Sequence, residues 1–304
     1  MATVQALERE PSRDDVADRL LGRAKATPRP MLGRYELTRE LGRGAMGTVF
    51  LGRDPRLNRT VAVKAIPLAE EFEERDVVEL RSRFVREAEM AARLSHPGIV
   101  TVFDAGEDGA LAYIAMEYVD GRLLSEFTAS DRLLPARQVL EILARVADAL
   151  DYAHAQGIVH RDVKPANLIF DPDTLDTKIM DFGIARLTNS SATRTGIVLG
   201  TPSFMSPEQL EGRSVTGRSD LFSLGVTLFQ LLAGQLPFRA DSMTGLMDKI
   251  ANAGHPPLRA IRPELPPCVA GIVDRLLAKD PAKRFNAAGE AAQALRACAG
   301  TLPD

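Results

Sequence analysis

The residues with the clearest chemical content lie in two segments. The first is His160-Arg161-Asp162-Val163-Lys164-Pro165-Ala166-Asn167, and the second, Asp181-Phe182-Gly183, begins nineteen residues after Asp162. Five specified side chains at the spacing of the first segment would arise by chance in about one chain in 10⁴. One carboxylate can accept or orient the proton of a hydroxyl group. The other, with the Asn167 amide, supplies the hard oxygen ligands that Mg²⁺ prefers. The two segments predict chemistry on a hydroxyl beside a magnesium site.

The first segment is expected to be a loop on a rigid support. It follows a helical run that ends near Gly157, and it is followed by the apolar residues Leu168-Ile169-Phe170. Catalytic groups are often carried by loops that a rigid scaffold positions, so this placement fits a functional segment better than a structural one.

A glycine-rich segment, Gly42-Arg43-Gly44-Ala45-Met46-Gly47, has the pattern GxGxxG. The pattern alone is weak, because the glycine content of the chain predicts about 0.13 chance matches of this kind. A hairpin turn without a ligand is therefore one interpretation. A dinucleotide site would need a helix directly after the glycines, whereas strand-like Thr48-Val49-Phe50-Leu51 follows here. This context favours a hairpin whose backbone N–H groups cover a triphosphate.

Lys64 is a charged residue inside the apolar run 60–66. A lysine on a strand usually points to solvent, and that interpretation stays open. Because successive side chains of a strand point to opposite faces, Val61 and Val63 share one face while Ala62 and Lys64 share the other. A small residue beside a cation suits an adenine base and its phosphates.

The elements around these motifs indicate an α+β protein. Strand-like segments occupy 35–54 (with the glycines at their turn), 60–66, 99–107 and 110–119, and one amphipathic helix is expected at 76–94. After residue 121 the chain is mostly helical, and its longest amphipathic run is 133–154. Strands grouped first and helices afterwards predict two lobes with a cleft between them.

Composition narrows the class of protein. The chain has 304 residues, of which 45% are hydrophobic and 26% charged, as in ordinary soluble globular proteins. Its net charge of −3 argues against a general nucleic-acid binder. The uncharged stretch 221–238 contains glycines, polar residues and a proline, which favour a core helix at about 220–233 over a membrane span.

Two features lie outside these motifs. Cys268 and Cys298 are not spaced as a zinc motif, and we interpret them as reduced thiols of a cytosolic protein rather than as a disulfide. Residues 1–33 are interpreted as a separate extension, in which Ser12 could cap a short helix ending near Ala26.

The order of these motifs, followed by Ser206-Pro207-Glu208, resembles that of protein kinases, and specifically of eukaryotic-like bacterial serine/threonine kinases. The resemblance covers about 35–298. It implies a bilobal fold with a small β-rich N-lobe carrying one helix at 34–117 and a larger α-helical C-lobe at 118–299. Residues 1–33 and 300–304 would be an extension and a tail.

The resemblance also implies an activity. The protein would transfer the γ-phosphoryl group of Mg-ATP to Ser or Thr hydroxyls of protein substrates. Mn²⁺ in place of Mg²⁺, and a homodimer, are compatible with it. It implies a cytoplasmic enzyme, or the cytosolic part of a longer protein, with no nucleic-acid partner and no membrane segment in these residues.

Site residues follow from the resemblance by position. Asp162 would orient the substrate hydroxyl and accept its proton, Lys164 would contact the γ-phosphate, and Asn167 and Asp181 would bind the metal. Lys64 would bind the α- and β-phosphates and pair with a helix glutamate, for which Glu87 is the candidate and Glu89 the alternative. The nucleotide-binding set that the resemblance implies is Leu41, Gly42, Gly44, Gly47, Val49, Ala62, Lys64, Met116, Glu117, Val119 and Ile169.

Other matching positions carry structural roles. The resemblance implies a buried ion pair between Glu208 and Arg284, and hydrogen bonds from the backbone near His160 and Arg161 to Asp220. Ser206 replaces the usual Ala, a departure that removes no charge from the reaction. We therefore expect an active enzyme rather than a pseudokinase scaffold. The peptide platform formed by these residues argues against a small-molecule phosphotransferase.

The segment between Gly183 and Ser206 is rich in hydroxyl groups. A polar loop without modification is one interpretation. The alternative is autophosphorylation at Thr193 and Thr195, with Arg161 and Arg186 binding the added phosphates and ordering the loop.

Overall fold

The computed structural model describes residues 30–44, 47–67, 84, 86, 88–182 and 202–303. Their contacts divide the chain into two compact units. The first comprises the described residues up to Ala92 together with Val102–Tyr118, and the second comprises Arg93–Thr101 together with the described residues from Val119 onward. Among the described residues, a β-sheet dominates the first unit and helices dominate the second, which confirms the expected α+β class.

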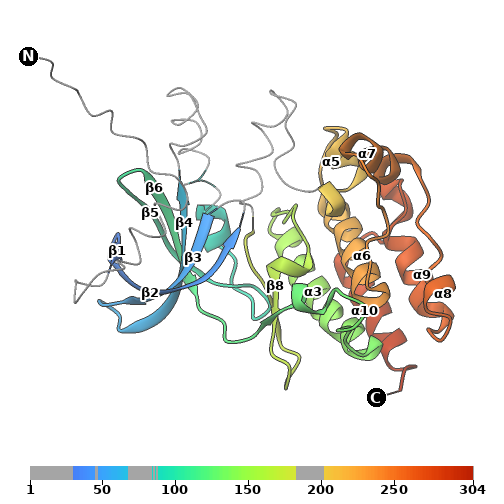
Figure 1. Ribbon diagram of the computed structural model, residues 1–304, viewed down its shortest axis with the longest axis horizontal. Helices are drawn as coiled ribbons and strands as arrows, with labels where there is room; N and C mark the ends of the chain where they lie inside the picture. Colours follow the sequence, from blue (N-terminus) through green and yellow to red (C-terminus); the bar gives the residue numbers. More distant parts are fainter. Residues whose placement is uncertain are drawn as a thin grey trace, which may run out of the picture. The chain divides into compact units, whose positions relative to one another are not determined.

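The sheet of the first unit has six strands in the order β1-β2-β3-β4-β6-β5, and all neighbouring strands are antiparallel (Figure 1). The strands are β1 (Met31–Leu32), β2 (Tyr35–Gly44), β3 (Gly47–Asp54), β4 (Arg59–Pro67), β5 (Val102–Asp108) and β6 (Leu111–Glu117). The glycine segment therefore lies at the β2–β3 hairpin, as predicted.

The strand expected at 99–107 begins later than the sequence suggests, at Val102. The residues before it pair with a different strand, because Ile99 forms a parallel bridge with Ile179 and the Val100 amide donates to the Ile179 carbonyl at 2.9 Å. In the helix expected at 76–94, the described residues that are helical are 84, 86 and 88–92.

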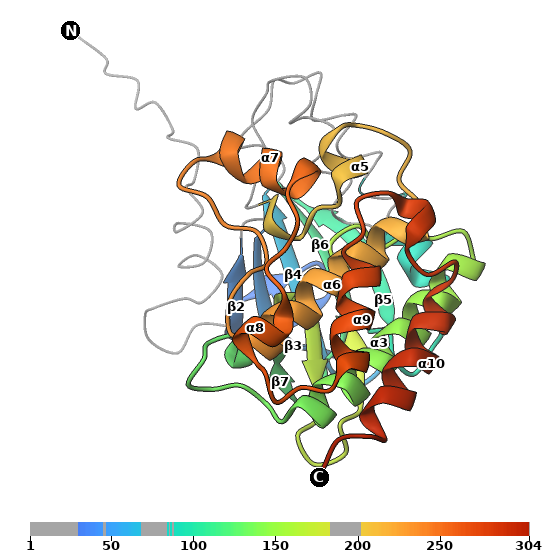
Figure 2. The same cartoon turned by 90° about the vertical axis from the view of Figure 1, so that its right-hand side faces the viewer.

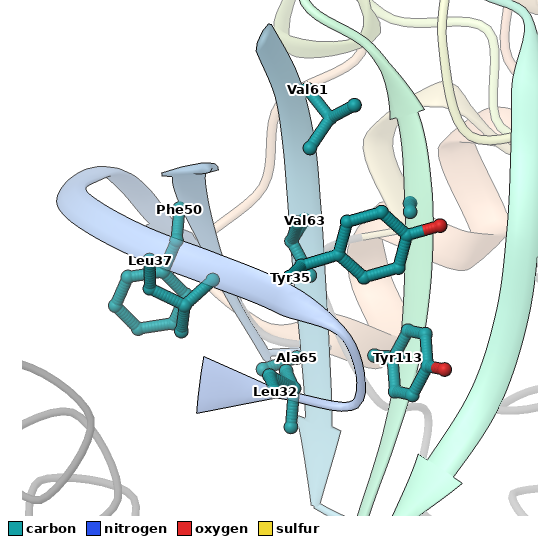
Figure 3. Close-up of a cluster of buried hydrophobic side chains, with 9 residues drawn as sticks. Leu32, Tyr35, Leu37, Phe50, Val61, Val63, Ala65 and Tyr113 are labelled. Carbon is teal, nitrogen blue, oxygen red and sulfur yellow. The ribbon is translucent and has the colours of Figure 1, made fainter. Parts of the chain in front are cut away.

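One face of the sheet carries an apolar cluster (Figure 3), which consists of Leu32, Tyr35, Leu37, Phe50, Val61, Val63, Ala65, Tyr113 and Ala115. The alternation predicted for β4 is confirmed, since Val61 and Val63 belong to this cluster and Ala62 and Lys64 do not. The rings of Tyr35 and Tyr113 meet edge to face with centroids 5.8 Å apart. This packing fixes which face of the sheet Lys64 occupies.

The second unit contains most of the helices within the described residues. They are α3 (Ala136–Ala155), α5 (Pro207–Leu210), α6 (Gly217–Ala233), α7 (Met243–Asn252), α8 (Leu258–Ile261), α9 (Pro267–Leu276) and α10 (Ala288–Ala299). Short 3₁₀ turns occupy Leu124–Phe127, Pro165–Asn167, Pro202–Phe204 and Pro281–Lys283. A small antiparallel sheet joins β7 (Arg122–Leu123), β8 (Leu168–Phe170) and β9 (Thr177–Ile179).

Helix α6 is the core element of the second unit. It packs against α3, α8, α9 and α10 (Figure 2), and nearly all of its residues are buried. Thr216 begins the helix by accepting a hydrogen bond from the Arg218 amide, and Gly234 ends it with a φ of +69°. Of the helices within the described ranges, none is long and apolar enough to span a membrane. The burial of α6 among the other helices confirms the core interpretation of this stretch.

The interpretation of the two cysteines as reduced thiols is wrong for this structure. Cys268 and Cys298 form a disulfide, with their Cα atoms 5.9 Å apart. Their separation in sequence gave no sign of this, because proximity depends on how α9 and α10 pack. That packing brings the first turn of α9 beside the last turn of α10.

The ion pair expected between Glu208 and Arg284 is confirmed. The guanidinium donates to both carboxylate oxygens at 2.7 and 2.9 Å, and both side chains are buried. Arg284 also donates to the backbone carbonyls of Ala278, Arg218 and Lys279. Burial opposes ionisation of Glu208, but hydrogen bonds from Arg284 and Ser219 outweigh it and hold the pKa of Glu208 below its usual value.

The disulfide closes a loop of 30 residues. We expect protein purified without reductant to show no thiol reactive toward a maleimide after denaturation, and two after reduction. Because the crosslink restricts the unfolded chain, its reduction should lower the free energy of unfolding by about 2–4 kcal/mol. Urea titrations with and without reductant measure this loss. A Cys268→Ser/Cys298→Ser variant is the control, since reductant should no longer affect it. Two reactive thiols without reductant would contradict the disulfide.

Acid should weaken the buried Glu208–Arg284 ion pair only below the ordinary pKa of a glutamate. Because folding lowers the pKa of Glu208, its carboxylate stabilises the folded state at pH values above 4.5, the ordinary pKa of the group. This contribution is lost as the pH falls through the lower pKa of the folded state. Glu208→Gln should therefore cost several kcal/mol at pH 7, about 3–5 by analogy with broken buried pairs. The difference from the parent should shrink below pH 4.5. Urea titrations across this pH range measure it.

Glu141→Gln is the matched control for this experiment. Glu141 accepts from Arg137 at 3.0 Å in a half-exposed pair on α3. Such pairs contribute only about 0–1 kcal/mol, so the control variant should stay close to the parent at every pH. Equal losses of unfolding free energy in the two variants would show that burial does not make the Glu208 pair more stabilising than an exposed pair.

Candidate active site

Residues 160–167 connect α3 to β8 and end in the 3₁₀ turn Pro165–Asn167; this segment is hereafter the 160–167 loop. At its centre the Asp162 carboxylate accepts hydrogen bonds from Lys164 Nζ at 2.7 Å and from Asn167 Nδ2 at 3.0 Å, both on Oδ2. Three of the residues predicted from sequence thus lie around one carboxylate. A cation and an amide donor held against an acidic oxygen keep that carboxylate in a fixed orientation.

The orientation of the Asn167 amide is set by its partners. Its Nδ2 donates both to Asp162 Oδ2 and to the Asp162 backbone carbonyl, the latter at 2.8 Å. Both acceptors are oxygens, so the nitrogen of the Asn167 amide must face them. The amide oxygen then lies on the other side of the amide group. Asn167 is buried, and that oxygen is of the type that hard divalent cations bind.

Asp181 follows β9 directly after Met180. The Met180 amide donates to the Asn167 carbonyl at 3.0 Å, so a backbone hydrogen bond connects the segments of the two predicted metal ligands. The φ of Asp181 is +65°, in the left-handed region that costs a non-glycine residue about 1 kcal/mol or more. Strain of this kind is often found at functional sites.

His160 connects the loop to β9 through its ring. Its Nδ1 accepts from the Asp162 amide at 3.1 Å, so Nε2 carries the hydrogen that is donated to the Met180 carbonyl at 2.9 Å. The ring is fully buried and meets Phe182 edge to face with centroids 4.5 Å apart. His160 therefore relates the position of Asp162 to the segment that carries Asp181.

The Asp220 carboxylate, in the first turn of α6, holds the start of the loop. It accepts from the amides of His160 at 2.8 Å and Arg161 at 2.7 Å, as the resemblance implied. A third partner, His154 Nε2, lies 2.7 Å away. The carboxylate is fully buried, and its place near the helix N-terminus also favours its negative charge.

In the first unit, the strand register places four of the predicted nucleotide-binding residues on one face of the sheet. Val49 pairs with Lys64, and Ala62 pairs with Met116. Residues directly opposite each other in antiparallel strands share a face, and Ala62 and Lys64 alternate with the core residues Val61 and Val63. Lys64 is buried on this face rather than pointing to solvent.

The three glycines of the hairpin differ in what the fold requires. Gly47 has a φ of +136°, and a Cβ there would lie 2.0 Å from the Ala65 carbonyl oxygen, so only glycine fits. Gly42 and Gly44 are exposed, and a Cβ at either would meet no atom of the described residues within 4 Å. Contacts within the described structure do not explain glycine at these two positions.

The remaining predicted residues divide between the units. Leu41 lies at an irregularity of β2, and Glu117 is the last residue of β6, both in the first unit. Val119 and the half-buried Ile169 of β8 belong to the second unit. The predictions made for Glu87, Thr193, Thr195 and Arg186 fall outside the described residues.

Sequence reasoning missed two residues, one that contacts the 160–167 loop and one that contacts Asp220. His154 reaches Asp220 from the last turn of α3. Gln209 donates from its Nε2 to the Arg161 carbonyl at 3.0 Å. Ser206 and Gln209 carry a signal that could have been found, since their spacing is that of a helix capping box. The contact of Gln209 with the loop has no signature in the sequence.

Comparisons with known proteins place this geometry in context. A family model described as protein kinase domain matches residues 35–296. The serine/threonine-protein kinase PknB of Mycolicibacterium smegmatis is 41% identical over 288 residues, which cover 91% of this chain and 45% of PknB. The serine/threonine-protein kinase PrkC of Bacillus subtilis is 38% identical over 257 residues, which cover 84% of this chain and 39% of PrkC. The chain thus spans less than half the length of these relatives.

Among solved structures, the PknI kinase domain of Mycobacterium tuberculosis is similar throughout its length. Its crystal structure aligns with a TM-score of 0.72 and 35% sequence identity, and the alignment covers 90% of this chain and all of that one. The similarity therefore extends over both units and is not confined to the motif segments.

Proposed function

The chain belongs to the protein kinase family, whose domain model matches residues 35–296, and on this premise we propose that it is a protein serine/threonine kinase. It would transfer the γ-phosphoryl group of ATP to Ser or Thr hydroxyls of protein substrates. The observation that carries the proposal is the Asp162 carboxylate held between Lys164 and Asn167. The names of the two bacterial relatives support the same acceptor class.

Asp162 would act on the acceptor hydroxyl. Its Oδ2 is engaged by Lys164 and Asn167, so we assign Oδ1 to the substrate. The hydroxyl oxygen forms a bond to the γ-phosphorus while the bond from that phosphorus to the bridging oxygen of ADP breaks, and the hydroxyl proton passes to Asp162. Lys164, already beside Asp162, would contact the γ-phosphate and offset its charge.

The donor set fits a divalent cation. The Asn167 amide oxygen and the Asp181 carboxylate are hard oxygen ligands on segments joined by the hydrogen bond between Met180 and Asn167. When bound, Mg²⁺ supplies positive charge that offsets the negative phosphates. The contribution of the chain is to hold these two oxygens in place, and Mn²⁺ would find the same ligands.

The first unit would bind the nucleotide. Lys64 supplies a buried cation for the α- and β-phosphates, and Val49, Ala62 and Met116 on the same face supply apolar surface for adenine. Glycine at positions 42 and 44, which contacts within the described structure do not explain, would let phosphates approach the backbone N–H groups.

Several finer expectations stay predictions. They are the pairing of Lys64 with Glu87, the base contacts of Leu41, Glu117, Val119 and Ile169, the use of Mn²⁺, a homodimer, and a cytoplasmic location. The presence of Lys64, Asp162, Asn167 and Asp181 favours an active enzyme over a scaffold.

Asp162→Asn tests the proposal directly. The amide cannot accept the hydroxyl proton, so kcat for transfer to a mixed Ser/Thr peptide library should fall by about 10²–10⁴. ATP binding, measured by calorimetry, should change little because Asp162 acts on the acceptor. Lys64→Met should also strongly reduce turnover. Asp173→Asn, in an exposed turn, is the matched control and should behave like the parent. Near-normal transfer by both site variants would refute the assignment.

We further propose that Thr193 and Thr195 are autophosphorylated. Each phosphate adds nearly two negative charges at neutral pH, which arginines can bind. Mass spectrometry of the purified protein should find phosphate at both threonines in the parent and at neither in Asp162→Asn. A map of the parent without phosphate between residues 188 and 196 would count against the proposal.

A further inference from the structure

We propose that Gln209 is a positioning residue for the transfer reaction, because its side-chain amide fixes the peptide group that leads into Asp162. The inference rests on the role proposed above for Asp162. Its starting observation is the hydrogen bond from Gln209 Nε2 to the Arg161 carbonyl, 3.0 Å long and spanning 48 residues of sequence.

Arg161 needs external support because its backbone is strained. Its φ is +71°, in the left-handed region that costs a non-glycine residue about 1 kcal/mol or more. Both of its backbone polar groups are held by side chains from other elements. The amide donates to Asp220 of α6 at 2.7 Å, and the carbonyl accepts from Gln209 of α5.

The bond to Gln209 acts on Asp162 through the planarity of the peptide group. The Arg161 carbonyl and the Asp162 amide belong to one rigid plane. Gln209 holds the oxygen of this plane, and His160 Nδ1 holds its N–H at 3.1 Å. With both ends fixed the plane cannot rotate, and the direction in which the Asp162 side chain leaves the backbone is set.

Ser206 determines which way the Gln209 amide faces. The Oε1 atom accepts from both the backbone amide and the hydroxyl of Ser206, each at 3.0 Å. Two donors on the oxygen leave the nitrogen facing the Arg161 carbonyl. This gives a role to the departure noted in the sequence, where Ser replaces the usual Ala, since alanine would provide only one of these donors.

The helix cap and the contact with the loop make different chemical demands. The capping box needs an acceptor at position 209, and glutamate serves there as well as glutamine. Only the bond to the Arg161 carbonyl needs a donor. Gln209→Glu therefore keeps the cap and removes the contact with the loop.

We expect Gln209→Glu to melt within about 2 °C of the parent, a change equivalent to about 1 kcal/mol for a protein of this size. The kcat for the mixed Ser/Thr peptide library should fall about tenfold or more, the change that loss of one hydrogen bond can produce. The KM for ATP should change less than twofold, because the nucleotide does not contact the displaced peptide.

The pH dependence gives a second readout. When the introduced carboxyl is protonated it can again donate to the Arg161 carbonyl. The ratio of variant to parent kcat should therefore rise as the pH is lowered from 8 toward 5.5. A residue that serves only as a helix cap would give a ratio near one at every pH.

Two further variants control the experiment. Gln293→Glu makes the same change on the exposed side of α10 and should behave like the parent. Ser206→Ala removes one of the two donors that orient the amide and should lower kcat less than Gln209→Glu does.

A Gln209→Glu enzyme with parental kcat at every pH would overturn the inference. So would a loss of kcat that comes with a matching loss of melting temperature. Activity retained in Asp162→Asn would instead overturn the function itself.

Discussion

One buried carboxylate, that of Asp220, holds together the chemistry of the second unit. An ionised carboxylate without water is costly unless donors surround it, and here two backbone amides and the ring of His154 do so. Both amides belong to the 160–167 loop, so the hydrogen bonds that stabilise the charge of Asp220 also fix the shape of the loop. Neither can be changed without the other.

The neighbouring residue in α6 extends this arrangement. Ser219 donates to Glu208, which pairs with Arg284, while Asp220 binds the loop. Two successive residues of one helical turn thus connect the segment after Ser206 to the segment before Asp162. Gln209 adds a direct link between these two segments by donating a hydrogen bond to the Arg161 carbonyl. The strain at Arg161 and Asp181 persists because hydrogen bonds made by His160, Gln209 and Asp220 hold the backbone beside these residues.

How much of this the sequence could predict depends on the kind of interaction. Alternation along a strand is a local property, so the shared face of Ala62 and Lys64 followed from the sequence. The register between strands is not local, and the pairing of Val49 with Lys64 required the structure. The same holds for the disulfide and for Gln209, which depend on the packing of distant elements. The late start of β5 has this cause too, since Ile99 pairs with a strand that lies about 80 residues further along the chain.

The burial of α6 on every side has a consequence for biosynthesis. Its partner α3 is made before it, but α8, α9 and α10 are made after it. While the ribosome is still producing those later helices, part of the apolar surface of α6 has no cover. Such surface favours self-association and chaperone binding. Gene fragments that stop before residue 288 would leave α3 and α6 in that state permanently, so a fragment chosen for expression should extend through α10.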